Sequence, residues 1–295
     1  MTKIARALFV LTVSAAWAPA TAQQPPPASD QAPIVVTGEK SSKEAVRNFV
    51  RDLTPVGAGG QLSRFEDAVC PIVFGLAPTQ NAAVEDRIRE VAKAAGIAVP
   101  AAKCSPNVVL IVASDKRAVL EELRRRHADY FGDLSGNQIR AVIRNPAPVD
   151  AWQIQGVPLS QDGRELHQNA QGVVENYTTA RASRIGTTAR PQYEAAVVVV
   201  AFDALDGLSV KQLADYVALR ALTGADPAKL RKSAPPTILH VFDAPFGSAV
   251  PITLTAWDLS FLRNYYDARR NLTAAAQRSA IAKAMTDDRQ TPEGQ

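Results

Sequence analysis

The feature that most constrains the fold of this chain is an apolar run followed at once by a helix, within Tyr193–Leu222. The run Ala195–Phe202 contains four consecutive valines. A run of β-branched residues without alternating polar positions is typical of a strand that is buried on both faces. Ser209 and Gln212 then form a capping box, which predicts the start of a helix. Because this helix is apolar around most of its circumference, we expect the strand and the helix to form the core on which the other elements pack.

An earlier part of the chain has the order strand, helix, strand, helix that is typical of an α/β module. Residues 69–76 and Val108–Ala113 are apolar runs of strand length. Between them, residues 82–95 carry apolar side chains at helical spacing, and Gly96 supplies the stop. Ser114 or Asp115 caps the helix that follows.

The remaining pattern predicts additions to this module. We expect further strands at 149–157 and 182–188, and further helices at 41–53, around 138–143, from Thr255 and from Thr273 to Met285. Residues 238–242 form a buried segment too short to assign to a helix or a strand. The sequence therefore predicts an α/β fold, with α+β as the alternative, built on a mixed sheet of about five strands with helices packed on it and a helical C-terminal third.

Residues 1–22 have the pattern of a signal peptide. Lys3 and Arg6 precede an apolar stretch, 7–17, that is too short to span a bilayer. The small residues at 20–22 match the cleavage signal of exported proteins. The alternative is an N-terminal helix of the mature fold. We expect an exported protein, located in the periplasm or secreted.

The rest of the chain divides by composition. A Pro-rich linker covers 23–40, a single globular domain covers 41–285, and a polar tail covers 286–295. A boundary near residue 148 is the alternative division of the globular part.

The chain contains two cysteines, Cys70 and Cys104. An even number of cysteines in an exported chain favours a disulfide bond, and two buried thiols are the alternative. Because Cys70 lies at the start of the first predicted strand and Cys104 precedes the second, the bond would join the entrances of those strands.

The charge balance does not favour a nucleic-acid partner. The whole chain carries 33 Lys and Arg against 29 Asp and Glu, and removal of residues 1–22 would leave 31 basic residues. The one dense basic cluster, Arg124–Arg126, is explained by the solvated end of a helix. We expect no nucleic-acid partner and no transmembrane segment in the mature chain. The sequence does not identify the partner, and an envelope protein and a small ligand are the two candidates.

No metal or cofactor is predicted. The three histidines, His127, His167 and His240, form no HExxH motif and have no second histidine or cysteine one turn away. The pair Asp203 and Asp206 lacks the alternating ligands of a calcium loop and fits a turn between a strand and a helix.

No catalytic motif for acyl transfer is present either. The chain has no GxSxG elbow and no SxxK motif, and the segment around Ser248 lacks the first glycine of an elbow. The low-ranking candidates for a site assembled from scattered residues are Asp215, His240 and Ser248.

Asp215 has two interpretations. It lies on the otherwise apolar helix that begins at Ser209, where Lys211, one turn earlier, can form a surface pair with it. Alternatively, it is a buried carboxylate, bonded to the backbone or to an arginine, that fixes the helix against the sheet.

Several segments resemble a group of uncharacterised exported proteins of alphaproteobacteria. These segments are 180–222, 238–242, Leu254–Asn271 and Cys104–Asp115. The group implies no established activity. The order of a strand, a helix and a late tyrosine-bearing helix is also similar to zincin-like exported domains of unknown function. Active zincins carry HExxH on that helix, and this chain does not, so the second resemblance implies a relative without metal.

These observations lead to one main hypothesis and two alternatives. The main hypothesis is an exported, non-catalytic binding or interaction protein of a Gram-negative envelope. The alternatives are a zincin-like relative without metal and a hydrolase that uses the scattered residues named above.

Overall fold

The structure, a computed structural model, describes residues 43–55, 60–100, 103–171, 174–176, 187–245 and 247–290. All of them belong to one compact unit, Ser41–Gln295.

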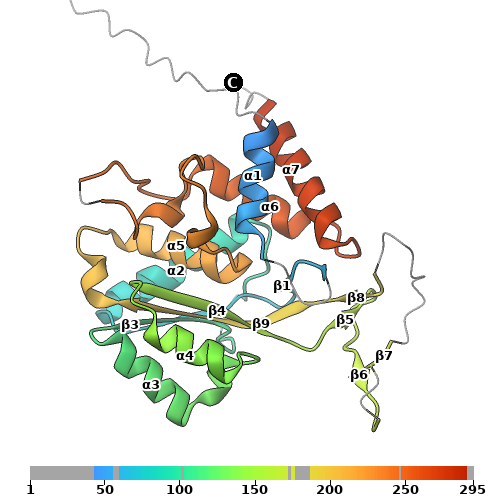
Figure 1. Cartoon of the computed structure of the whole chain (residues 1–295), viewed down its shortest axis with the longest axis horizontal. Coiled ribbons are helices and arrows are strands. Elements are labelled where there is room, and N and C mark those ends of the chain that lie inside the picture. The colour runs from blue at the N-terminus through green and yellow to red at the C-terminus, as the bar shows by residue number, and fades with distance from the viewer. Residues whose placement is uncertain are drawn as a thin grey trace, which may run out of the picture. The chain divides into compact units, whose positions relative to one another are not determined.

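A mixed sheet of five strands forms the centre of this unit (Figure 1). Its middle strand is β9 (Gln192–Ala201), which corresponds to the valine-rich run. Along one edge of β9 lie β3 (Val108–Ala113) and the short β1 (Arg64–Phe65), both parallel to it. Along the other edge lies β4 (Val149–Gln155), antiparallel to it. β2 (Pro71–Phe74) pairs with the outer edge of β3, so β2 and β4 are the two edge strands.

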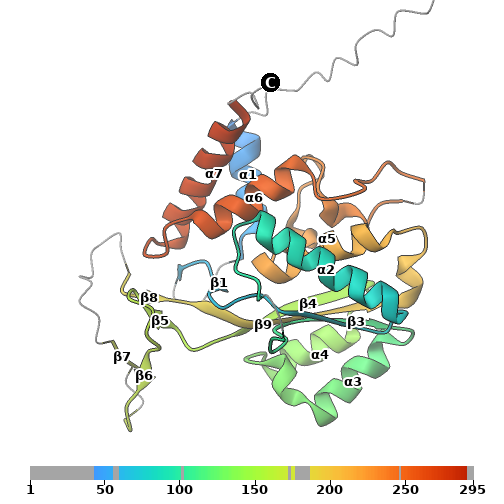
Figure 2. The ribbon, with the colours of Figure 1, turned by 180° about the vertical axis from the view of Figure 1, so that it is seen from behind.

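Helices cover both faces of the sheet, as Figures 1 and 2 show from opposite sides. α2 (Pro78–Ala94) and α5 (Val210–Thr223) lie on one face, with α1 (Lys43–Leu53), α6 (Ala256–Asp267) and α7 (Ala274–Gln290) beyond them. α3 (Lys116–Arg126) and α4 (Gly136–Arg144) lie on the opposite face. The predicted α/β fold with a mixed sheet and a helical C-terminal region is confirmed.

Short elements complete the chain. Four 3₁₀ helices are described: η2 (Ala128–Phe131), η3 (Phe202–Leu205), η4 (Pro227–Lys229) and η5 (Ile238–His240). Two small sheets join β5 (Leu159–Ser160) to β8 (Ala189–Arg190) and β6 (His167–Gln168) to β7 (Val174–Glu175). Most of the strand predicted at 182–188 lies outside the described residues, and residues 187–188 are not in a strand.

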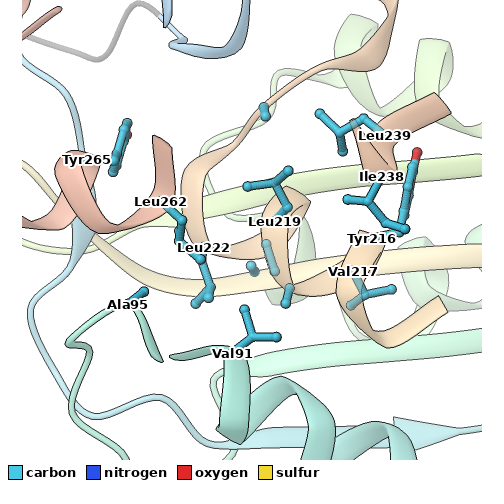
Figure 3. Packing of buried hydrophobic residues seen from close by; sticks show 14 of the residues in the cluster. Val91, Ala95, Tyr216, Val217, Leu219, Leu222, Ile238, Leu239, Leu262 and Tyr265 are labelled. Carbon is cyan, nitrogen blue, oxygen red and sulfur yellow. The ribbon is translucent and has the colours of Figure 1, made fainter. Parts of the chain in front are cut away.

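The side chains of β9 alternate between two apolar clusters because successive residues of a strand point to opposite faces. Ala196, Val198 and Val200 belong to the cluster on the α2 and α5 side. Val197 and Val199 belong to a smaller cluster with Trp152 on the α3 and α4 side. Figure 3 shows the larger cluster, in which Val91 and Ala95, at the end of α2, face Leu222 of α5.

The predicted disulfide bond is present. Cys70 and Cys104 are bonded, with their Cα atoms 6.1 Å apart. They precede β2 and β3, so the bond joins the entrances of two neighbouring parallel strands. Within the described part of the chain, no helix combines the length and the apolar character needed to cross a membrane.

We expect the double variant Cys70→Ala/Cys104→Ala to lose about 3–4 kcal/mol of free energy of unfolding, because the bond closes a loop with a sequence separation of 34. Urea denaturation of the oxidised wild type and of the variant gives this difference. A reductant should destabilise the wild type by the same amount and leave the double variant unchanged. Equal stability of the two oxidised proteins would contradict the expectation.

Candidate functional site

A groove of about 900 Å³ follows the edge strand β4. The end of α5 and the segment that follows it form one wall, through Arg220, Gly224 and Pro227. The start and end of α4 contribute to the other wall, with Gln138 and Asn145. In Figure 1, β4 lies along the near edge of the sheet, between α4 on one side and α5 on the other. The groove therefore has an edge strand along its floor.

Arg220 is the residue of this groove that ordinary packing does not explain. Its side chain lies in the groove wall although the residue is only 9% exposed. Its Nη1 atom donates a hydrogen bond to the hydroxyl of Tyr216, 2.8 Å away, and its guanidinium carbon lies 5.7 Å from the centre of the Tyr216 ring. Its Nε atom is buried and has no hydrogen-bond partner among the described residues. No described carboxylate lies within 4 Å of the guanidinium.

The other buried arginines of the described chain are satisfied. Arg64 donates to the carbonyl oxygens of Tyr265, Tyr266 and Ala268, at the C-terminal end of α6. Arg190 donates to the carbonyl oxygen of Ser160 and lies 3.5 Å from the carboxylate of Glu66. Buried cations are normally paired in this way, because an unpaired buried charge costs several kcal/mol. Arg220 departs from that rule.

The end of α5 fixes the position of Arg220. Tyr216 and Arg220 are four residues apart on α5, so they share one face of the helix. Gln153 of β4 donates from its side-chain amide to the carbonyl oxygen of Arg220, at 2.9 Å. The helix ends at Gly224, whose φ of +69° suits glycine. A Cβ atom at Gly224 would also lie only 3.0 Å from the side chains of Gln153 and Tyr193.

Three acidic residues line the same groove without pairing with Arg220, namely Asp150, Asp226 and Asp243. The carboxylate of Asp226 accepts from the main-chain N–H of Ala228 and caps η4, and Asp243 is exposed. Burial raises the pKa of the Tyr216 hydroxyl, and the charge of Arg220 opposes this. The hydroxyl therefore stays protonated at neutral pH and accepts the hydrogen bond from Arg220.

The sequence-predicted candidate Asp215 is a structural carboxylate. It is fully buried, and its oxygens accept hydrogen bonds from Nε and Nη2 of Arg87, at 2.6 and 3.2 Å. The hydroxyl of Thr253 and the main-chain N–H of Leu254 also donate to it. Of the two interpretations, the buried carboxylate bonded to an arginine and to the backbone is confirmed. It joins α5 to α2 and to the segment before α6, and not to the sheet.

The other two candidates, His240 and Ser248, lie elsewhere. His240 is half-buried in η5 and lines a pocket of about 390 Å³ that includes neither Asp215 nor Ser248. Ser248 is exposed in a turn, where its main-chain N–H donates to the carbonyl oxygen of Pro245. No hydrogen bond joins any two of the three candidates in the described structure.

The remaining histidines also lie apart. His127 lies at the end of α3 and lines a mainly apolar pocket of about 620 Å³ on the α3 side of the sheet, while His167 is exposed in β6. Within the described ranges, no group of three or more His, Cys, Asp or Glu side chains is placed to hold a metal ion.

Sequence reasoning missed Arg220, although a signal was present. A charged residue on a helix that is apolar on nearly all sides must be buried, paired or placed at an opening. That reasoning singled out Asp215 on this helix, and it applies equally to Arg220.

We expect Arg87→Met to lower the free energy of unfolding by about 3–5 kcal/mol, because it leaves the buried carboxylate of Asp215 without its counter-charge. Asp215→Asn should cost less, because the side chain of Arg87 is 26% exposed and can be hydrated. Urea denaturation measures both changes. Arg117→Met is the matched control, because its pair with Glu121 is exposed and should contribute less than about 1 kcal/mol. Equal losses in Arg87→Met and Arg117→Met would contradict this role.

Comparison with known proteins found no matching protein-family model, no matching curated protein and no matching solved structure.

Proposed function

We propose that this chain is an exported, non-catalytic binding protein that holds an anionic ligand against Arg220 in the groove along β4. The observation that supports the proposal is the burial of Arg220 without a carboxylate partner among the described residues. A ligand that carries a carboxylate or a phosphate would supply the missing negative charge. The planar guanidinium group of arginine binds both of these anions with paired hydrogen bonds.

The energetics favour a functional role for this arginine. A buried, unpaired cation lowers the stability of the folded protein, and an apolar side chain of similar length would avoid that cost. Strained or destabilising arrangements of this kind concentrate at binding sites, where the ligand compensates them. Arg220 faces a groove, whereas the satisfied Arg64 is bonded to the end of a helix.

The lining of the groove supports binding in preference to nucleophilic catalysis. The described lining residues include no histidine, cysteine, serine or threonine. The carboxylate of Asp150, which also lines the groove, is already bonded to Lys116 and to the side-chain amide of Asn145. The groove therefore offers the buried cation of Arg220, the exposed cation of Lys229 and hydrogen-bonding groups, but no activated nucleophile among its described lining residues.

Export rests on the pattern of residues 1–22 and is supported by the disulfide bond between Cys70 and Cys104, a bond that is typical of oxidising compartments. We expect the chain produced in a Gram-negative bacterium to reach the periplasm or the medium with Gln23 as its first residue. Mass spectrometry of the intact protein from each fraction tests this. A chain that keeps residues 1–22 and remains in the cytoplasm with free thiols would contradict export.

We expect Arg220→Met to abolish anion binding while raising the stability of the ligand-free protein by about 1–2 kcal/mol, because it removes an unpaired buried charge. Calorimetric titration with succinate and, separately, with inorganic phosphate measures binding and shows which anion is preferred. Urea denaturation without either anion measures stability.

Lys232→Gln is the matched control for charge, since Lys232 is exposed and does not line this groove. It should bind the preferred anion as the wild type does. Equal binding by Arg220→Met and the wild type, or no binding of either anion to the wild type at millimolar concentration, would contradict the proposal.

A further inference from the structure

The floor of the groove exposes unused main-chain hydrogen-bonding groups. The main-chain N–H of Ala201 in β9 donates to the carbonyl oxygen of Pro148, just before β4. In an antiparallel pair, hydrogen-bonded residues alternate with residues whose N–H and C=O groups point away from the partner strand. With the register Val149 opposite Val200, the groups of Val149, Ala151 and Gln153 therefore point away from β9. No described residue bonds the main chain of Ala151 or Gln153 on that side.

The opposite edge of the sheet is different. The main-chain N–H of Val108 in β3 donates to the carbonyl oxygen of Cys70, so the groups of Pro71 and Val73 in β2 point away from β3. Side chains of α2 bond these groups. The N–H of Val73 donates to Glu85, at 3.0 Å, and the carbonyl oxygen of Pro71 accepts from Arg89, at 3.4 Å. Natural proteins usually protect edge strands in this or a similar way. The edge at β4 lacks this protection in the described structure.

The open edge and the unpaired cation belong to the same groove. Val149, Ala151 and Gln153 line it together with Arg220. The side chain of Gln153 bonds the main-chain carbonyl oxygen of Arg220, so the edge strand is joined to the residue that carries the cation. The length of β4, Val149–Gln155, suits an added strand of about 20 Å, at about 3.3 Å per residue.

We infer that the ligand of this groove is an extended peptide segment of a partner protein, which adds a strand to β4 and places a carboxylate against Arg220. This inference rests on the proposed function and specifies its ligand. Main-chain bonds to Ala151 and Gln153 supply affinity that is independent of side chains, as in other cases of strand addition. Pairing with Arg220 selects a segment that carries an acidic group at the right position.

The test uses two pools of random seven-residue peptides, acetylated and amidated at their ends, one with glutamate and the other with glutamine at the central position. Neither pool contains any other acidic residue. The purified protein is incubated with each pool, and retained peptides are quantified by mass spectrometry. We expect the glutamate pool to be retained at least tenfold better than the glutamine pool, and Arg220→Met to remove this difference.

The variant that tests the strand addition is Ala151→Pro. Proline removes the N–H that points into the groove but leaves the bonds between β4 and β9 intact, since these come from the alternate residues. We expect it to weaken retention of the glutamate pool roughly tenfold, through the lost hydrogen bond and the bulk of the ring. Ala151→Val keeps the N–H in the same strand and should retain the peptides within about twofold of the wild type.

A second measurement applies even if Ala151→Pro fails to fold. Hydrogen exchange of the wild type, followed residue by residue by NMR, should slow at least tenfold at the amides of Ala151 and Gln153 when the glutamate pool is added. The amide of Trp152, which is bonded to β9, should change much less. Slow exchange at Ala151 before any peptide is added would show that another part of the chain already covers the edge, and would overturn the inference.

The outcomes separate this inference from the proposed function. Equal retention of both pools, or of the glutamate pool by Arg220→Met and the wild type, would contradict the role of Arg220 itself. Glutamate-dependent retention that Ala151→Pro leaves unchanged, with no protection of Ala151 or Gln153, would overturn the strand addition alone. In that case the ligand would be a carboxylate that does not pair with the edge.

Discussion

The burial of β9 on both faces and along both edges is the constraint on which the rest of the structure depends. Val197 to Val200 are fully buried, and they alternate between the two apolar clusters. A strand of this kind requires helices on each side of the sheet and partner strands on each edge. The chain supplies β3 and β1 along one edge and β4 along the other. The outer edges of the sheet are therefore those of β2 and β4. Side chains of the neighbouring α2 bond the main chain of β2, whereas no described helix bonds the outer main-chain groups of β4.

Most buried charged side chains in the core have hydrogen-bond partners for their buried polar atoms, and the exception, Arg220, lies at the margin of the core. Asp258 is fully buried, and it accepts hydrogen bonds from the hydroxyl groups of Thr237 and Thr255 and from the main-chain N–H of Ile238. Burial still raises the pKa of its carboxyl group, so those bonds do not fully offset the cost of removing it from water. Asp215 and Arg64 are satisfied in a similar way. Among the described buried charged side chains, Arg220 lacks a counter-charge and also keeps a buried nitrogen without a hydrogen-bond partner, and it lies where the core opens into a groove.

Local signals predicted much of the fold from the sequence. The strand Val108–Ala113 has the predicted bounds, and the capping box of Ser209 and Gln212 begins α5 as expected. The short strand β1 was missed, because a strand of two residues has no periodicity and exists only through its register with β9. The partner of Asp215 was missed for a similar reason. Arg87 is 128 residues away in sequence, so only the packing of α2 on α5 brings it close, whereas Lys211 was considered because it is one turn away.

The groove itself could not be predicted from local sequence pattern, because its lining residues come from segments that are far apart in the sequence and meet only in the folded chain. The alternation of β4 predicts a strand, but whether its outer edge is covered depends on where α4 and the segment after α5 lie. Gln153 of β4 bonds the main-chain carbonyl oxygen of Arg220 at the end of α5, so the residue that carries the cation lies beside the open edge only in the folded chain. A main-chain edge alone would accept many extended segments, and a cation alone would accept many anions. Because both features lie in one groove, a ligand that binds there with full affinity must satisfy both, which is how the groove can select its partner.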